Sequence, residues 1–178
     1  MAMPRQQLSL EQFLRLPEEE PALEFEEGEV TQKVSPTKGK HSRLQGVIFR
    51  FLDDYARPRK LAMVFPELRV TFAGRSYVPD VSVYRWERIP LDASGQIAND
   101  FCDPPDVAVE IASPGQSANA LVRRCLWYVA NGVPIALLVD AADASVLLFR
   151  PNQVPAALRE SDMIDIGDVL PGFDLTVQ

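Results

Sequence analysis

The chain has 178 residues, of which 47% are hydrophobic and 24% are charged, and its formal net charge is -7. This length and composition are typical of one soluble globular domain, so we expect a single domain over residues 1–178. The negative charge argues against a broad non-specific nucleic-acid-binding face, and one histidine with no Cys-x-x-Cys pair excludes the usual zinc patterns.

The sequence shows no sign of membrane insertion or export. No apolar run approaches the roughly 18 residues that a membrane span needs, and the polar stretch Met1 to Gln7 does not resemble a signal peptide. The two cysteines, Cys102 and Cys125, do not make a disulfide framework. We therefore expect a cytoplasmic protein with no membrane partner.

The first third of the chain predicts a short helix, a hairpin and a long helix. Ser9-Leu10-Glu11-Gln12 is a capping-box pattern that starts the short helix. A strand around Leu23-Glu24-Phe25, a turn at Glu27-Gly28 and a partner strand over 30–34 suggest the hairpin. Apolar residues at helical spacing predict a helix over 41–55.

The rest of the chain alternates strands with one more helix. The pattern predicts strands over 63–72, 77–84, 107–111, 135–139 and 146–149, an irregular loop over 85–103, a helix over 116–131, and a loop-rich tail with one edge strand. The strand-helix-strand unit over 107–139 implies a parallel crossover. We therefore expect an α/β fold, with an α+β mixed sheet and one long helix on each side.

Two of these strands carry an acid where a buried strand normally has none. Asp80 lies in Val78-Pro79-Asp80-Val81, and Glu110 lies in Val107-Ala108-Val109-Glu110-Ile111. An unpaired carboxylate in a core costs several kcal/mol, so such a residue usually has a partner, a metal or a raised pKa. Two of them in neighbouring strands suggest a metal site. The alternatives are a turn role for Asp80 and a buried ion pair with an arginine for Glu110.

The order Pro79-Asp80, a loop and then Val109-Glu110-Ile111 resembles the PD-(D/E)xK nuclease superfamily. Further segments along nearly the whole chain resemble the Uma-two family of bacterial endonucleases. They are Leu23-Glu24-Phe25-Glu26-Glu27-Gly28-Glu29, His41 at a helix start, Val78-Pro79-Asp80-Val81, Pro105 to Pro114, Tyr128 to Pro134 leading into Leu137-Leu138-Val139-Asp140, and Leu170-Pro171-Gly172-Phe173. The resemblance implies a restriction-endonuclease-like fold and Mg²⁺-dependent hydrolysis of DNA phosphodiester bonds.

The chemistry of paired acids agrees with this implication. Two carboxylates about 4 Å apart repel by roughly 4 kcal/mol at an effective dielectric of about 20, and Mg²⁺ (or Mn²⁺) between them removes that cost. We assign Asp80 and Glu110 as metal ligands, the carbonyl of Ile111 as a third ligand, and Glu24 as an outer catalytic carboxylate. Asp106 also follows a proline, but four strand residues place it ~13 Å from Glu110, so we interpret it as structural.

The chain departs from the superfamily pattern at the motif lysine. The expected position, two residues after Glu110, is Ala112, and family members commonly carry the lysine instead on the next helix, where this chain has Arg124. Arginine keeps the positive charge but cannot release a proton. We expect Arg124 to reach the Asp80–Glu110 cluster and to do part of the electrostatic work of the missing lysine. The alternative is that Arg124 pairs with a surface acid.

Other polar residues leave two interpretations open. His41 either supports the metal ligands or binds phosphate, or it is a helix-capping or packing residue. A set of basic residues flanking the long helix either contacts a DNA backbone or is solvated surface. These residues are Lys38, Lys40, Arg43, Arg57, Arg59 and Lys60.

Two functions therefore remain in view. The first is a Mg²⁺-dependent endonuclease acting on DNA, impaired if the motif lysine is essential. The alternative is a catalytically inactive nuclease-fold protein that binds nucleic acid or protein. A third reading is an unrelated α/β protein whose acids are structural. A homodimer remains open in each case.

Overall fold

The computed structural model describes residues 7–34 and 39–178. Its elements in chain order are α1 (Leu10–Leu14), β1 (Leu23–Glu26), β2 (Glu29–Gln32), α2 (Gly39–Ala56), β3 (Ala62–Pro66), β4 (Val70–Phe72), β5 (Arg75–Tyr77), β6 (Val81–Arg85), η1 (Trp86–Arg88), β7 (Val107–Ile111), α3 (Ala118–Ala130), β8 (Ile135–Asp140), β9 (Ser145–Phe149) and β10 (Ala156–Arg159). This order confirms the predicted succession of helices and strands. The predicted fold class is also confirmed.

Two predicted strands, however, are each divided between two sheets. The segment predicted over 63–72 becomes β3 and β4, and the segment over 77–84 becomes the end of β5 and β6. The first break contains Glu67, whose φ of 50° is left-handed. The second break contains Pro79, which has no N–H to donate to a strand ladder. The strands therefore form one four-stranded and one six-stranded sheet instead of a single sheet.

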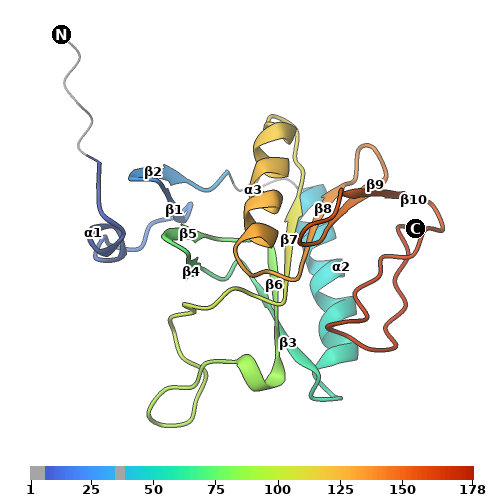
Figure 1. Cartoon of the computed structure of the whole chain (residues 1–178), viewed down its shortest axis with the longest axis horizontal. Helices are drawn as coiled ribbons and strands as arrows, with labels where there is room; N and C mark the ends of the chain where they lie inside the picture. Colours follow the sequence, from blue (N-terminus) through green and yellow to red (C-terminus); the bar gives the residue numbers. More distant parts are fainter. Residues whose placement is uncertain (1–6, 35–38) are drawn as a thin grey trace.

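The six-stranded sheet has the order β10-β9-β8-β7-β6-β3. Within it β7 and β8 run parallel and the other neighbouring pairs are antiparallel. The helix α3 connects β7 to β8, which confirms the predicted parallel crossover. Figure 1 shows α3 and α2 on opposite sides of this sheet. The prediction of one long helix on each face is thus confirmed.

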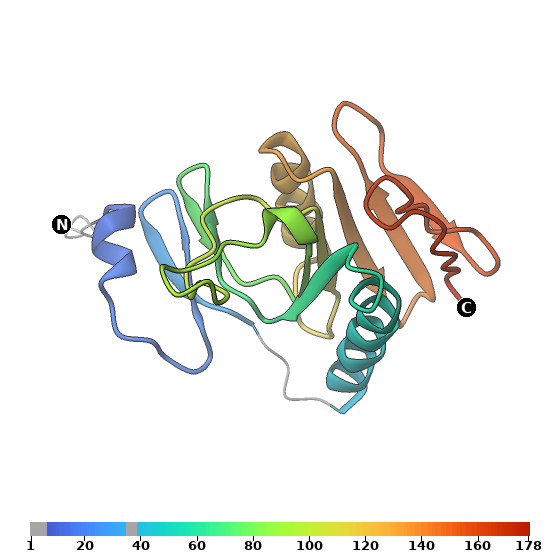
Figure 2. The same cartoon turned by 90° about the horizontal axis from the view of Figure 1, so that it is seen from below.

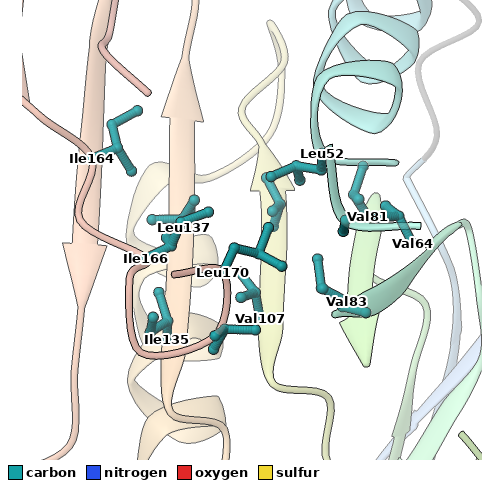
Figure 3. Packing of buried hydrophobic residues seen from close by; sticks show 14 of the residues in the cluster. Leu52, Val64, Val81, Val83, Val107, Ile135, Leu137, Ile164, Ile166 and Leu170 are labelled. Atoms are coloured by element: carbon teal, nitrogen blue, oxygen red, sulfur yellow. The ribbon is translucent and has the colours of Figure 1, made fainter. Parts of the chain in front are cut away.

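The side chains of β7 alternate between the two faces. Val107, Val109 and Ile111 pack in a core with Leu52 and Ala56 of α2, whereas Ala108 packs in a second core with α3. The first core also takes in the C-terminal tail, which covers the same face of the sheet. Figure 3 shows residues of the tail beside residues of the strands and of α2. The labelled residues are Leu52, Val64, Val81, Val83, Val107, Ile135, Leu137, Ile164, Ile166 and Leu170.

The helix α3 has clear start and stop signals. The side chain of Ser117 accepts a hydrogen bond from the backbone N–H of Ala120 at 3.3 Å and caps the N-terminus. Gly132 follows the last turn with a φ of 102°, and a Cβ there would lie 3.2 Å from Pro104, so glycine suits the position. None of the helices within residues 7–34 and 39–178 is both long and apolar enough to cross a membrane.

The four-stranded sheet, of order β2-β1-β5-β4, lies at the N-terminal end of the molecule together with α1 (Figure 2). The predicted capping box is present, because Ser9 and Gln12 exchange side-chain and backbone hydrogen bonds. Phe13 of α1 stacks on Phe25 of β1 with ring centroids 5.2 Å apart. This packing holds the β1–β2 hairpin in place. The hairpin brings Glu24 and Lys33 toward the larger sheet.

Candidate active site

Asp80 lies directly before β6 and faces Glu110 of β7. The antiparallel register pairs Val81 with Val109, so the next pair along opposes Asp80 to Glu110. Directly opposed residues in such a pair have Cβ atoms about 4.5–5.5 Å apart. The side chain of Asp80 is buried, and its Oδ2 accepts a hydrogen bond of 2.7 Å from the backbone N–H of Ile111. This register agrees with the sequence-based expectation that the side chains of Asp80 and Glu110 lie close together.

Glu110 is buried on the α3 side of the sheet. The hydroxyl of Tyr128 donates a hydrogen bond of 2.8 Å to Glu110 Oε1, and Arg124 Nη1 lies 3.6 Å from the same oxygen. Burial raises the pKa of Glu110 to about 7, Arg124 opposes the shift, and the charges of Asp80 and Glu24 add to it. Binding of either a proton or a cation would therefore stabilise the Glu110 carboxylate.

Glu24 reaches the same place from β1 of the other sheet. Its carboxylate accepts hydrogen bonds from both terminal nitrogens of Arg124, at 3.0 and 2.6 Å, and from the backbone N–H of Val78 at 3.0 Å. The guanidinium of Arg124 also lies over the ring of Tyr77, 4.4 Å from its centroid. Arg124 therefore reaches the acid cluster as predicted, but its principal partner is Glu24 and Glu110 is the more distant one.

Lys33 is the site residue that the sequence analysis missed. It follows β2 directly, is buried, and places Nζ 2.8 Å from Asp80 Oδ1 and 3.4 Å from Glu67 Oε1. Burial lowers the pKa of Lys33, but the charge and hydrogen bond of Asp80 outweigh burial and the pKa lies above its ordinary value. The sequence held only a weak signal, because Lys33 lies within the strand predicted over 30–34 and a shift of one residue in the alternation changes the face of the sheet that its side chain takes.

His41 belongs to the surroundings of Asp80. Its Nδ1 lies 2.8 Å from Ser113 Oγ, and its Nε2 lies 3.6 Å from Asp80 Oδ1. The Nε2 atom is buried and has no hydrogen-bond partner among the described residues. Of the two roles left open, these contacts support a role beside the site, in which His41 lies between Ser113 and Asp80.

The acid cluster lines a cavity of about 650 Å³ between the β1–β2 hairpin and α3. The wall includes three acids of the cluster and four basic residues, namely Glu24, Asp80, Glu110, Lys33, Arg75, Arg123 and Arg124. Within residues 7–34 and 39–178, no three His, Cys, Asp or Glu side chains are gathered closely enough to hold a metal ion together. An ion here would have to rely on two carboxylates, with a backbone carbonyl and water completing its shell.

The other sequence candidates lie away from this cavity. Asp106 is fully buried and accepts hydrogen bonds from Arg88 Nη1 at 2.7 Å and from the backbone N–H of Arg85 at 2.8 Å, so it is structural as predicted. Arg57, directly after α2, pairs with Asp53 of that helix at 3.0 Å. Lys40, Arg43, Arg59 and Lys60 are exposed and do not line the cavity, and Lys38 lies outside the described residues.

Comparison with known proteins places this geometry in a family. The profile of the Uma2 family, described as "Putative restriction endonuclease", matches residues 10–178. The chain belongs to the Uma2 family. A crystal structure of a putative nuclease belonging to DUF820 from Anabaena variabilis ATCC 29413 is 36% identical, with a TM-score of 0.91 over 96% of this chain and 95% of that one. The fold and the family predicted from the sequence are therefore both confirmed.

The remaining comparisons add less to the Uma2 assignment. The DrdV–DNA complex matches with a TM-score of 0.42 and 12% identity, over 66% of this chain and 10% of that chain, and this likeness carries no argument. No match was found among curated proteins.

Proposed function

We propose that this Uma2 protein is an endonuclease that uses Mg²⁺ or Mn²⁺ to hydrolyse phosphodiester bonds of DNA. The observation that carries the proposal is the opposed pair Asp80 and Glu110 at the wall of a cavity that also holds buried Lys33 and half-buried Arg124. Acids placed in this way are of little use to a core, but they suit a site that must hold positive charge and a phosphate together. The family assignment supports a nuclease.

The residues present fit a hard divalent cation. Mg²⁺ takes oxygen ligands and is usually held by one or two carboxylates, with waters and substrate phosphates in the other positions. Asp80 and Glu110 would supply the carboxylates, and the carbonyl of Ile111 a third oxygen. The pKa of Glu110 is raised by burial and by neighbouring acids even though Arg124 lies 3.6 Å away, so a bound cation would further stabilise its charged form. Glu24 is held by Arg124 and fits an outer role.

When bound, such an ion supplies Lewis-acid chemistry that activates water and neutralises charge on the phosphate. The residues of this chain would orient the parts. Tyr128 and Ile111 fix the two carboxylates by hydrogen bonds of 2.8 and 2.7 Å. Arg124 holds Glu24 and closes that side of the cavity. Arg123 is exposed at the same wall and can meet a DNA phosphate from outside.

The direct test is metal-dependent cutting with matched variants. Wild type should nick or linearise plasmid DNA with Mg²⁺ or Mn²⁺ and stop when a chelator is added. Glu110→Gln should lower the rate by about 10²–10⁴, the usual range for a positioned catalytic group. Asp92→Asn, in the exposed loop after η1, should cut like wild type. A wild type that binds metal and DNA but never cuts would contradict the proposal.

One observation favours the alternative of a binding module without activity. Both terminal nitrogens of Arg124 are held by Glu24, and Lys33 is bonded to Asp80, so two of the three acids already have cationic partners. A protein in which these ion pairs persist would bind nucleic acid at the cavity and leave it intact. Gel-shift binding that is unchanged by a chelator, together with no cleavage, would identify this function.

A further inference from the structure

Lys33 is an unusual residue for the end of a hairpin strand, because its side chain is turned inward. Its backbone N–H donates a hydrogen bond of 2.7 Å to the carbonyl of Ala22, which continues the β1–β2 pairing by one residue. The side chain is 5% exposed and points to Asp80. A lysine is almost never this buried unless it is paired. The pairing with Asp80 therefore accounts for the inward position of the ammonium group.

The ammonium group of Lys33 faces the cavity, and its hydrogen bonds to the protein do not occupy all of its N–H donors. Lys33 lines the cavity together with Asp80 and Glu110. An ammonium has three N–H donors. Its hydrogen bonds among the described residues go to Asp80 at 2.8 Å and, at a weaker 3.4 Å, to Glu67. The geometry therefore leaves donor capacity on the cavity side.

Arg124, the other cation of the site, is fixed in a different way. Its two terminal nitrogens are bonded to Glu24, and its guanidinium plane lies over Tyr77. A bidentate and stacked guanidinium is held in one orientation. A lysine on a flexible stem can turn its charge toward a ligand, so Lys33 is better suited than Arg124 to follow a phosphate during a reaction.

We propose that Lys33, from the hairpin, is the catalytic cation of this site: it is held in place by Asp80 and donates to the phosphate that is cut. This inference rests on the proposed nuclease function. It assigns the role to a residue that precedes both acids in the chain, and to neither the strand position Ala112 nor the helix position Arg124.

The reaction needs no proton from Lys33. The oxygen of a water molecule forms a bond to phosphorus, and the bond from phosphorus to the leaving ester oxygen breaks. The attacking water gives one proton to solvent, and the leaving oxygen takes one from solvent. Negative charge builds on the non-bridging phosphoryl oxygens, and the ammonium stabilises it by a charge-assisted hydrogen bond.

The same position has a consequence for metal binding. The ammonium of Lys33 and a divalent cation are both attracted to Asp80 and repel each other. Removing the charge of Lys33 should therefore tighten metal binding while it slows cutting. Damage to the structure would weaken both, so the opposite signs separate a catalytic role from a merely structural one.

The experiment uses the full chain and three variants. Lys33→Gln removes the charge but keeps an N–H donor for Asp80, and Lys33→Arg keeps the charge. Arg159→Gln is the matched charge-removing control, because Arg159 is exposed on β10, pairs with Asp143 and does not line the cavity. Calorimetry gives the dissociation constant for Mg²⁺, and single-turnover cleavage of plasmid DNA gives the rate.

Lys33→Gln should bind Mg²⁺ on the order of tenfold tighter and cut about 10²–10³ more slowly, the range for loss of one charge-stabilising donor. Lys33→Arg should bind Mg²⁺ about as wild type does and cut faster than Lys33→Gln. Wild-type cutting with an equally fast Lys33→Gln, or no tightening of Mg²⁺ binding in Lys33→Gln, overturns the inference alone. A wild type that does not cut overturns the proposed function, and Lys33 is then only the counter-ion of Asp80.

Discussion

Asp80 and Asp106 begin as the same local motif and end in different surroundings. Each follows a proline and precedes one strand of the antiparallel pair β6–β7, so they lie at opposite ends of that pair. Asp106 is fully buried among groups that match it, with Arg88 Nη1 at 2.7 Å and Arg85 Nη1 at 3.5 Å. That end of the pair holds one acid between two arginines.

Within the hydrogen-bonded cluster at the Asp80 end there are more acids than cations, although Arg75 and Arg123 also reach the cavity wall. Three carboxylates, of Glu24, Asp80 and Glu110, share the charges of Lys33 and Arg124, and all five side chains line one cavity. A buried acid by itself therefore says little about function. An excess of buried acids beside an open space is the informative feature, because a core gains nothing from such an arrangement.

The largest expected effect on stability is at Asp106. Asp106→Ala leaves the guanidinium of Arg88 and the backbone N–H of Arg85 without their acceptor. Breaking a buried pair by removing one partner costs about 3 kcal/mol or more. Urea unfolding should show a loss of that size, while the cleavage rate measured well below the melting temperature stays within about threefold of wild type. A loss under about 1 kcal/mol would remove the contrast drawn between the two aspartates.

A smaller effect is expected at Arg124, on the other side of the comparison. Arg124→Ala removes both hydrogen bonds to Glu24 and the contact with Tyr77, and should lower the free energy of unfolding by about 2 kcal/mol. Arg124→Lys keeps the charge but not the bidentate geometry, and should lose about half as much. Equal losses in the two variants would show that charge alone matters there. Thermal unfolding by circular dichroism is the measurement.

The two acids of the site were predictable because strand patterning is a local signal. Val81 to Tyr84 and Val107 to Ile111 are apolar and β-branched, so Asp80 and Glu110 stand out in sequence. The register that opposes them follows from the antiparallel pairing of β6 with β7. The division into two sheets was missed because a strand pattern does not show to which sheet each half belongs.

The positions of the cations in the site depend on packing between distant segments, and no local pattern in the sequence indicates this packing. Lys33 is 47 residues from Asp80, and Glu24 is 100 residues from Arg124. Sequence proximity favoured Glu110 as the partner of Arg124, but the hairpin brings Glu24 closer. Only the docking of the small sheet against α3 decides both pairs.

The pH dependence of stability tests whether the Asp80 end is short of positive charge. Burial raises the pKa of Glu110 from 4.5 to about 7. Between these values the folded protein holds a proton that the unfolded chain has lost, so stability falls as pH rises through this window. Without added metal, the fall due to Glu110 over the whole window should be roughly 3 kcal/mol, at about 1.4 kcal/mol per pKa unit.

The variant Glu110→Gln isolates this contribution, because it keeps an oxygen acceptor for Tyr128 and carries no charge. The difference in unfolding free energy between wild type and variant should change between pH 5 and pH 8, with the variant gaining relative stability at the higher pH. A difference that is constant with pH would mean that Glu110 is already balanced by Arg124, 3.6 Å away.

The smallest expected effect concerns two buried serines near the acids. Ser113 Oγ lies 2.8 Å from His41 Nδ1, and His41 Nε2 lies 3.6 Å from Asp80. Ser113→Ala removes this hydrogen bond and leaves a buried ring nitrogen without its partner, which should cost about 1 kcal/mol.

Ser82, two residues after Asp80, is fully buried, and its Oγ has no hydrogen-bond partner among the described residues. Ser82→Ala should therefore be neutral or stabilising by up to about 1 kcal/mol, since an unsatisfied hydroxyl leaves the core. Urea unfolding of both variants under one condition gives the comparison, and equal losses would mean that the Ser113–His41 contact does not help to hold Asp80 in place.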